Sequence, residues 1–150
     1  MEEKTLSQMR AEVIEKFINI ETIINAIISQ HYFGNVNKQF FLEVLYDQNF
    51  NFALRHSILE KIVPDLDRTQ LQNLHRLNRI RNYFAHTGTE IFEGAEVPTE
   101  GQVGIVYDPR NLDKTIDYTQ LYEEFHTLES TVINYLFNLS KKLGVQYNKG

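Results

Sequence analysis

The 150-residue sequence contains no cysteine, which excludes both disulfide bonds and thiolate ligands for a metal ion. It has no uninterrupted apolar run approaching the roughly 18 residues that a membrane-spanning helix requires. Its first residues lack the basic and apolar regions of a secretory signal peptide. There is no internal repeat, proline-rich linker or low-complexity segment. These absences predict a cytoplasmic protein without a membrane partner.

Several motifs of ligand and catalytic sites are absent as well. The chain has no glycine-rich phosphate loop and no Gly-x-Ser-x-Gly nucleophile motif. None of its five histidines lies four residues from another, the spacing of a helical zinc site. We therefore expect neither a metal ion nor an organic cofactor.

The composition that remains is that of an ordinary folded domain. Hydrophobic residues make up 42% of the chain and charged residues 23%, which is too apolar for a disordered segment. The length suits one domain with a sizeable core. We predict a single domain over residues 1–150 with its helical core over about residues 6–143.

Apolar residues recur every three or four positions along most of the chain, which is the period of an amphipathic α-helix. Glycine and proline interrupt this pattern between the periodic segments. The sequence therefore predicts a mainly α fold, a bundle of about five helices, over residues 6–32, 36–46, 50–63, 67–86 and 117–143. Asp67 with Gln70, and Asp117 with Gln120, have the spacing of helix N-caps.

An irregular insertion separates the last two predicted helices. Residues 88–112 hold four of the seven glycines and two of the three prolines, so the segment is not expected to be helical. Within it, residues 90–92 and 103–107 have the residue types of short strands. They predict a small β-hairpin.

Charge is distributed unevenly along this acidic chain. The net charge of −5 combines +4 in residues 68–86, which contain four arginines and no acid, with −9 elsewhere. A chain with this net charge is not typical of a protein that coats nucleic acid. A local basic strip instead favours a narrow site that binds an anion. The strip follows one helix face and comprises Arg68, Gln72, His75, Arg79, Asn82 and His86.

Two charged residues fall where apolar residues belong. Arg81 lies in the middle of the apolar face of the 67–86 helix, and Glu21 lies in the centre of an apolar arc of the 6–32 helix that includes Ile18. Arginine and glutamate are rarely buried without a partner. We predict that Glu21 and Arg81 meet or share one polar pocket.

Two alternatives to this pairing and its chemical role stay open. Glu43 and Glu60 are alternative partners for Arg81. A buried salt bridge can also serve only to fix helix packing, without a role in chemistry.

The string Arg81-Asn82-Tyr83-Phe84-Ala85-His86 at a helix end resembles the R-x4-6-H signature of HEPN domains. A long first helix with an inward-facing acid is also similar to that family. The resemblance implies a HEPN-like bundle that forms a homodimer, with both copies of Arg81 and His86 lining one cleft. Gly88 stands where HEPN toxins paired with a nucleotidyltransferase antitoxin usually have a tyrosine, so modification of a tyrosine there is excluded.

The resemblance implies two alternative functions. The first is a metal-independent endoribonuclease, a toxin or phage-defence effector that acts on RNA and is controlled by an antitoxin or regulatory protein. The second is a catalytically inactive dimeric module that binds a protein or small ligand, similar to mannitol-repressor or stress-response regulators.

For the endoribonuclease alternative, each of these residues has a candidate role. His86 would move the proton of an RNA 2′-hydroxyl or of the leaving oxygen, and Arg81 would donate to the phosphate. Asn82 would bind a phosphate oxygen or orient His86, and Glu21 would hold Arg81. Arg79 and His75 are candidate substrate-binding residues, although His75 also suits a solvated helix face.

Five steps of about 100° place Arg81 and His86 about 140° apart on a regular helix. Two side chains so separated cannot share one face. Either the helix loosens before Thr87, or one site combines residues from two subunits.

Overall fold

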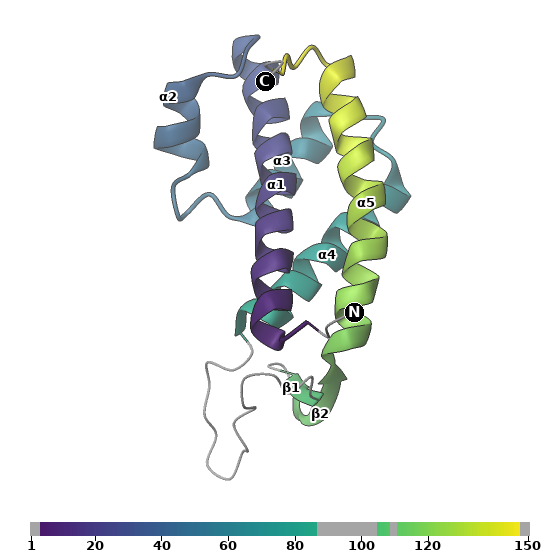
Figure 1. Ribbon diagram of the computed structural model, residues 1–150. Coiled ribbons are helices and arrows are strands. Elements are labelled where there is room, and N and C mark those ends of the chain that lie inside the picture. Colours follow the sequence, from purple (N-terminus) through teal and green to yellow (C-terminus); the bar gives the residue numbers. More distant parts are fainter. Residues whose placement is uncertain (1–3, 87–104, 109–110, 148–150) are drawn as a thin grey trace. The chain divides into compact units, whose positions relative to one another are not determined.

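A computed structural model describes residues 4–86, 105–108 and 111–147 (Figure 1). Within them the fold is mainly α, as predicted, with five α-helices and one π-helical segment. The helices are α1 (Leu6–Phe33), α2 (Lys38–Phe40), α3 (Phe52–Ile62), α4 (Arg68–His86) and α5 (Tyr118–Lys142). The π-helical segment η1 (Phe41–Leu45) directly continues α2.

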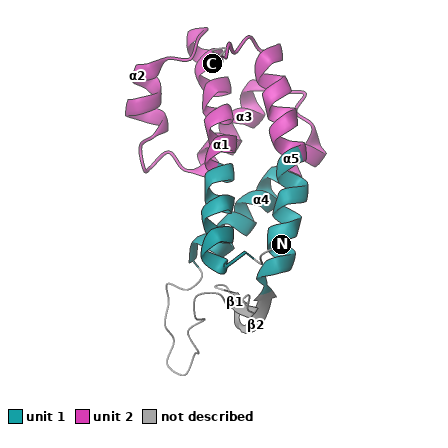
Figure 2. Ribbon diagram, viewed as in Figure 1, with its two compact units in different colours: residues 1–17, 74–130 teal, residues 18–73, 131–150 magenta. Residues whose placement is uncertain are grey.

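The described residues fall into two compact units (Figure 2). Unit 1 comprises residues 1–17 and 74–130, and unit 2 comprises residues 18–73 and 131–150. Helices α1, α4 and α5 are each divided between the two units. The single domain expected from the sequence stays a prediction.

Helix α1 has the length predicted from its apolar period. A reciprocal capping box begins it, because the Thr5 hydroxyl accepts from the Gln8 backbone N–H while the Gln8 side chain accepts from the Thr5 N–H. Gly34 ends it with a φ of +72°, a conformation that side chains with a Cβ rarely adopt. Ile18, expected in the buried arc, is 55% exposed, so that part of the prediction was wrong. The buried line runs through Val13, Phe17, Ile20, Ile24, Ile27 and Ile28.

The predicted helix over residues 36–46 exists only in part as an α-helix. The Asn37 side chain caps α2, and after three residues the chain changes to the wider π-helical turn of η1. The Tyr46 N–H donates to the carbonyl of Phe41, five residues back, at 2.9 Å. Hydrophobic period alone does not distinguish these two hydrogen-bonding patterns over so few residues.

Both predicted aspartate caps form. The Asp67 carboxylate accepts from the backbone N–H groups of Thr69 and Gln70, and Asp117 accepts in the same way at the start of α5. The Asp67 N–H donates to the Tyr135 hydroxyl, and the Gln70 side-chain oxygen has no hydrogen-bond partner among the described residues. The predicted Asp67 cap is therefore present at α4, without a returning hydrogen bond to the Gln70 side chain.

Strands β1 (Ile105–Asp108) and β2 (Asn111–Asp117) form a two-stranded antiparallel sheet, and β2 leads directly into α5. Val106 pairs with Ile116, and the register shifts between Tyr107 and Asp108. The strand predicted at residues 103–107 overlaps β1, but its pairing with β2 was not foreseen. The partner expected for it, residues 90–92, lies outside the described residues.

Each unit has its own apolar core. In unit 1 the core side chains come from α1, α4 and α5 and include Val13, Phe17, Leu74, Leu77, Ile80, Phe84, Tyr118 and Phe125. In unit 2 they include Ile24, Ile28, Leu45, Leu59, Val132 and Leu136. None of the helices within the described ranges combines the length and apolar character that crossing a membrane requires.

Candidate functional site at the end of α4

The motif from Arg81 to His86 forms the final turn and a half of α4, within unit 1. Ile80 and Phe84 are fully buried, which fixes the rotation of the helix about its axis. Arg10 of α1 donates from Nε to the Phe84 carbonyl at 2.8 Å. This bond satisfies one of the last carbonyls of α4, which have no partner within the helix. Arg10 thus anchors the end of α4, a role the sequence analysis missed.

Arg81 is half-buried against the first helix. Its guanidinium carbon lies 4.8 Å from the centroid of the Phe17 ring, which is within cation–π range. Its Nη2 also donates to the Asn78 side-chain oxygen at 2.8 Å. A buried aromatic ring and a neighbouring amide therefore orient the charge that the sequence placed on the apolar face of α4.

His86 is the last residue of α4 and is exposed, whereas Asn82 is half-buried. The chain remains α-helical through His86, so the helix does not loosen before Thr87. The angular separation of about 140° between Arg81 and His86 therefore applies. A single α4 helix directs these two side chains to different sides.

Glu21 lies in unit 2, where its Oε2 atom is 3.5 Å from Nη1 of Arg55. Its predicted meeting with Arg81 would join residues of different units and stays a prediction. The two alternative partners named for Arg81 have contacts of their own. Glu60 forms an ion pair with Arg68, and Glu43 accepts from the Gln39 amide.

Arg55 is a buried cation that the sequence analysis did not single out. It is only 6% exposed and donates from Nε to Asn25 Oδ1 at 2.7 Å. Its two terminal nitrogens donate to the backbone carbonyls of Phe50 and Leu45. The signal was available, because Arg55 stands at helical spacing from apolar residues that are buried on either side of it, as Arg81 does. A search for charged residues on the apolar face, which singles out Arg81 on α4, also singles out Arg55 on α3.

Arg79 and His75 are both exposed, one helical turn apart on α4. His86 and Asn82 follow on the same side of the helix at intervals of three and four residues. The structure thus brings four of the six predicted site residues onto one face of α4: His75, Arg79, Asn82 and His86. Arg81 lies on another side of that helix, and Glu21 lies on α1.

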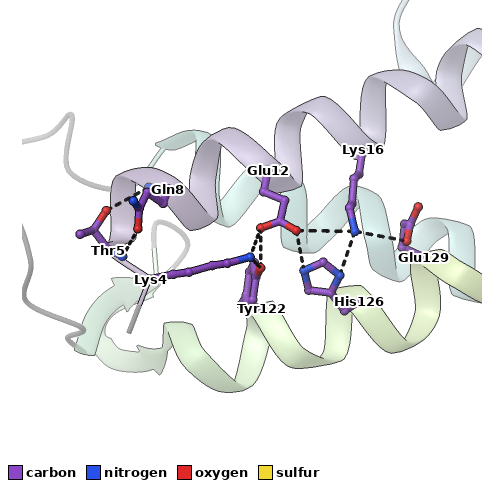
Figure 3. A network of polar contacts seen from close by, with 8 residues as sticks. All are labelled: Lys4, Thr5, Gln8, Glu12, Lys16, Tyr122, His126 and Glu129. Carbon is purple, nitrogen blue, oxygen red and sulfur yellow. Dashed lines mark hydrogen bonds and ion pairs between the residues drawn. The ribbon is translucent and has the colours of Figure 1, made fainter. Parts of the chain in front are cut away.

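A second polar cluster in unit 1 joins the N-terminal segment, α1 and α5 (Figure 3). Glu12 is at its centre and accepts from the Lys4 ammonium at 2.7 Å and from the Tyr122 hydroxyl at 2.5 Å. Its other oxygen lies 3.3 Å from His126 Nε2. The Lys16 ammonium, which can only donate, faces His126 Nδ1 at 3.1 Å, so the neutral ring carries its proton on Nε2.

These contacts shift the titration of the cluster. Hydrogen bonds from Lys4 and Tyr122 lower the pKa of Glu12 to about 2, and the bond to Glu12 raises the pKa of Lys4 to about 12. Burial and the neighbouring Lys16 charge lower the pKa of His126. Burial, followed by the bond to Glu12, raises the pKa of Tyr122. The cluster therefore favours an ionised glutamate and a neutral histidine.

The Glu12 cluster predicts a specific loss of stability in acid. A carboxylate whose pKa is lower in the folded state stabilises the protein above its ordinary value of 4.5, and this contribution disappears as the pH falls toward about 2. Glu12→Gln has no carboxylate at this position, so it lacks this contribution to stability at every pH. The free energies of unfolding of wild type and Glu12→Gln, measured with urea, should converge over this pH range.

Glu15→Gln provides the matched control, because Glu15 is exposed on the same helix. Its difference from wild type should not depend on pH in the way that the Glu12→Gln difference does. A constant difference between wild type and Glu12→Gln between pH 4.5 and about 2 would contradict the lowered pKa of Glu12.

Among the described residues, no group of three or more histidine, aspartate or glutamate side chains is arranged to hold a metal ion. The residues at the end of α4 offer an imidazole, an amide and guanidinium groups. Such groups can move a proton and bind an anion.

Comparison with protein-family models, with curated proteins and with solved structures found no match to this chain.

Proposed function

We propose that the protein is a homodimeric, metal-independent endoribonuclease of the HEPN type, with Arg81 and His86 as its reactive pair. The observation that carries the proposal is the arrangement of the α4 end: a guanidinium held against the Phe17 ring, followed by an exposed imidazole in the last turn. A cation that binds the phosphate and a histidine that transfers a proton are two groups that promote cleavage of RNA by its own 2′-hydroxyl.

In this reaction the 2′-oxygen attacks the adjacent phosphorus and the bond from phosphorus to the 5′-oxygen breaks. The 2′-hydroxyl loses a proton and the leaving 5′-oxygen gains one; His86 carries out one of these two transfers and solvent water the other. Arg81 donates hydrogen bonds to the phosphate oxygens as negative charge develops on them. Asn82 donates to a phosphate oxygen or orients the imidazole. The products are a 2′,3′-cyclic phosphate and a free 5′-hydroxyl.

The separation of Arg81 and His86 around α4 supports a dimer. Since one regular helix turns the two side chains about 140° apart, a single phosphate can contact both only if Arg81 and His86 come from different subunits. A two-fold axis close to the α4 ends would create two such sites. An antitoxin or other regulatory protein, as the resemblance implies, would then act on this dimer.

The proposal is tested with purified wild-type protein and a single-stranded RNA in the presence of EDTA. Cleavage should proceed without added metal ions, and mass spectrometry should find 2′,3′-cyclic phosphate ends. A dimeric preparation that leaves the RNA intact at high protein concentration would overturn the ribonuclease proposal. It would favour the inactive binding module.

A further inference from the structure

One face of α4 in unit 1 combines exposed cationic and polar side chains with a half-buried aromatic ring. The five positions span an arc of roughly 100° around the helix, at about 100° per residue. His75, Arg79 and His86 are exposed, and Asn82 and Tyr83 are half-buried. We call this face, defined by those five residues, the α4 track.

Arg79 differs from the other three arginines of α4. Arg68 and Arg76 each lie beside a glutamate, at 3.5 and 2.8 Å, and Arg81 lies over the Phe17 ring. Within the ranges that the structure describes, no hydrogen bond or ion pair involves the Arg79 side chain. Its charge is therefore available to an anionic ligand, on a helix that carries no acid from end to end.

Tyr83 gives the track a second kind of contact. Its neighbour Phe84 is fully buried and packs beside Tyr118, with ring centroids 5.4 Å apart, whereas Tyr83 remains partly open to solvent. Tyr83 is four residues after Arg79, so the two side chains are neighbours on the helix surface. A cation for the phosphate next to a ring for the base is the combination that binds single-stranded nucleic acid.

We propose that the α4 track binds single-stranded RNA beside the cleavage site, with Arg79 on a phosphate and Tyr83 stacked on a base. The inference rests on the proposed ribonuclease function and extends it to the form of the substrate. The eleven steps from His75 to His86 measure roughly 16 Å along the helix, which suits a few nucleotides. A duplex offers no unstacked base to Tyr83, so a single strand is the form that fits.

Binding is measured separately from cleavage with a fluorescein-labelled 2′-O-methyl oligouridine, which has no free 2′-hydroxyl to attack the phosphate. Fluorescence anisotropy of the full-length protein gives the binding constant at several KCl concentrations. Loss of one phosphate contact in Arg79→Ala should reduce the slope of log K against log salt by about 0.7. Arg79→Lys should retain the slope.

Lys61→Ala is the matched control, because it removes one exposed positive charge that belongs to α3 and not to the track. Its slope should equal that of wild type. Tyr83→Ala should weaken binding about tenfold through lost stacking, while Tyr83→Phe, which keeps the ring, should bind as wild type does. Circular dichroism verifies that Tyr83→Ala is folded, and the Arg79 comparison is independent of that variant.

Three results would overturn the track: an unchanged slope in Arg79→Ala, weakened binding in Tyr83→Phe equal to that in Tyr83→Ala, or equally tight binding of a duplex of the same length. If the wild type cleaves RNA but the slope is unchanged in Arg79→Ala, RNA binding by the α4 track is refuted. The ribonuclease proposal then still holds. The expected binding effects without any cleavage would establish the track and refute the ribonuclease.

Discussion

Replacing His86 with alanine is expected to lower the rate of RNA cleavage by about 10²- to 10⁴-fold, the usual contribution of a general acid or base. In the proposed reaction the imidazole is the group of the motif that takes or gives the proton, and no other residue of the string replaces it. Single-turnover cleavage in EDTA measures the chemical step. The affinity for the uncleavable oligouridine should change far less than the rate.

The loss should not come from unfolding. His86 is exposed at the end of α4, so His86→Ala should remain folded, with a cooperative urea unfolding transition. His31→Ala, at an exposed histidine of α1, serves as the matched control and should retain full activity. A His86→Ala protein that cleaves RNA at the wild-type rate would remove His86 from the reaction.

Replacing Arg55 with alanine is expected to destabilise the protein by about 3–5 kcal/mol, because the buried guanidinium leaves behind unsatisfied acceptors and a half-buried glutamate. The variant deprives Asn25 and the carbonyls of Leu45 and Phe50 of a donor and leaves Glu21 without this ion pair. Since whole domains are stable by only about 5–15 kcal/mol, the change is large. Urea unfolding followed by circular dichroism measures it.

Arg68→Ala is the matched control for Arg55→Ala. Both arginines lie 3.5 Å from a glutamate oxygen, but the Arg68 side chain is 82% exposed and that of Arg55 is 7% exposed. An exposed pair contributes at most about 1 kcal/mol, so Arg68→Ala should have a small effect. Arg55→Lys should fall between the two, because one ammonium cannot reach all three acceptors. Equal destabilisation by Arg55→Ala and Arg68→Ala would contradict the role given to burial.

The helices were predictable because their signals are local. The apolar period and the glycine at position 34 define α1, and Asp67 and Asp117 cap α4 and α5 as their sequence spacing predicted. The pairing of β1 with β2 was not predicted, because strand pairing depends on which segments meet rather than on either segment alone. The π-helical turn of η1 likewise differs from an α-helix by one hydrogen-bond step, which side-chain pattern does not report.

Periodicity identifies a charged residue on an apolar face but does not identify its partner. It placed Arg81 toward the core, yet the ring of Phe17 beside that charge and the Arg55 partner of Glu21 emerged only from the structure. The Glu12 cluster joins residues more than one hundred positions apart in sequence, for which no local pattern exists. Faces follow from sequence spacing, whereas contacts between faces depend on tertiary packing.

A mixed dimer shows whether Arg81 and His86 act together across two subunits. Arg81→Ala and His86→Ala chains are expressed together with different affinity tags, and the heterodimer is isolated and assayed on single-stranded RNA. If each site takes Arg81 from one subunit and His86 from the other, one intact site remains and activity should return to roughly half that of wild type. A heterodimer no more active than either parent homodimer would contradict the claim.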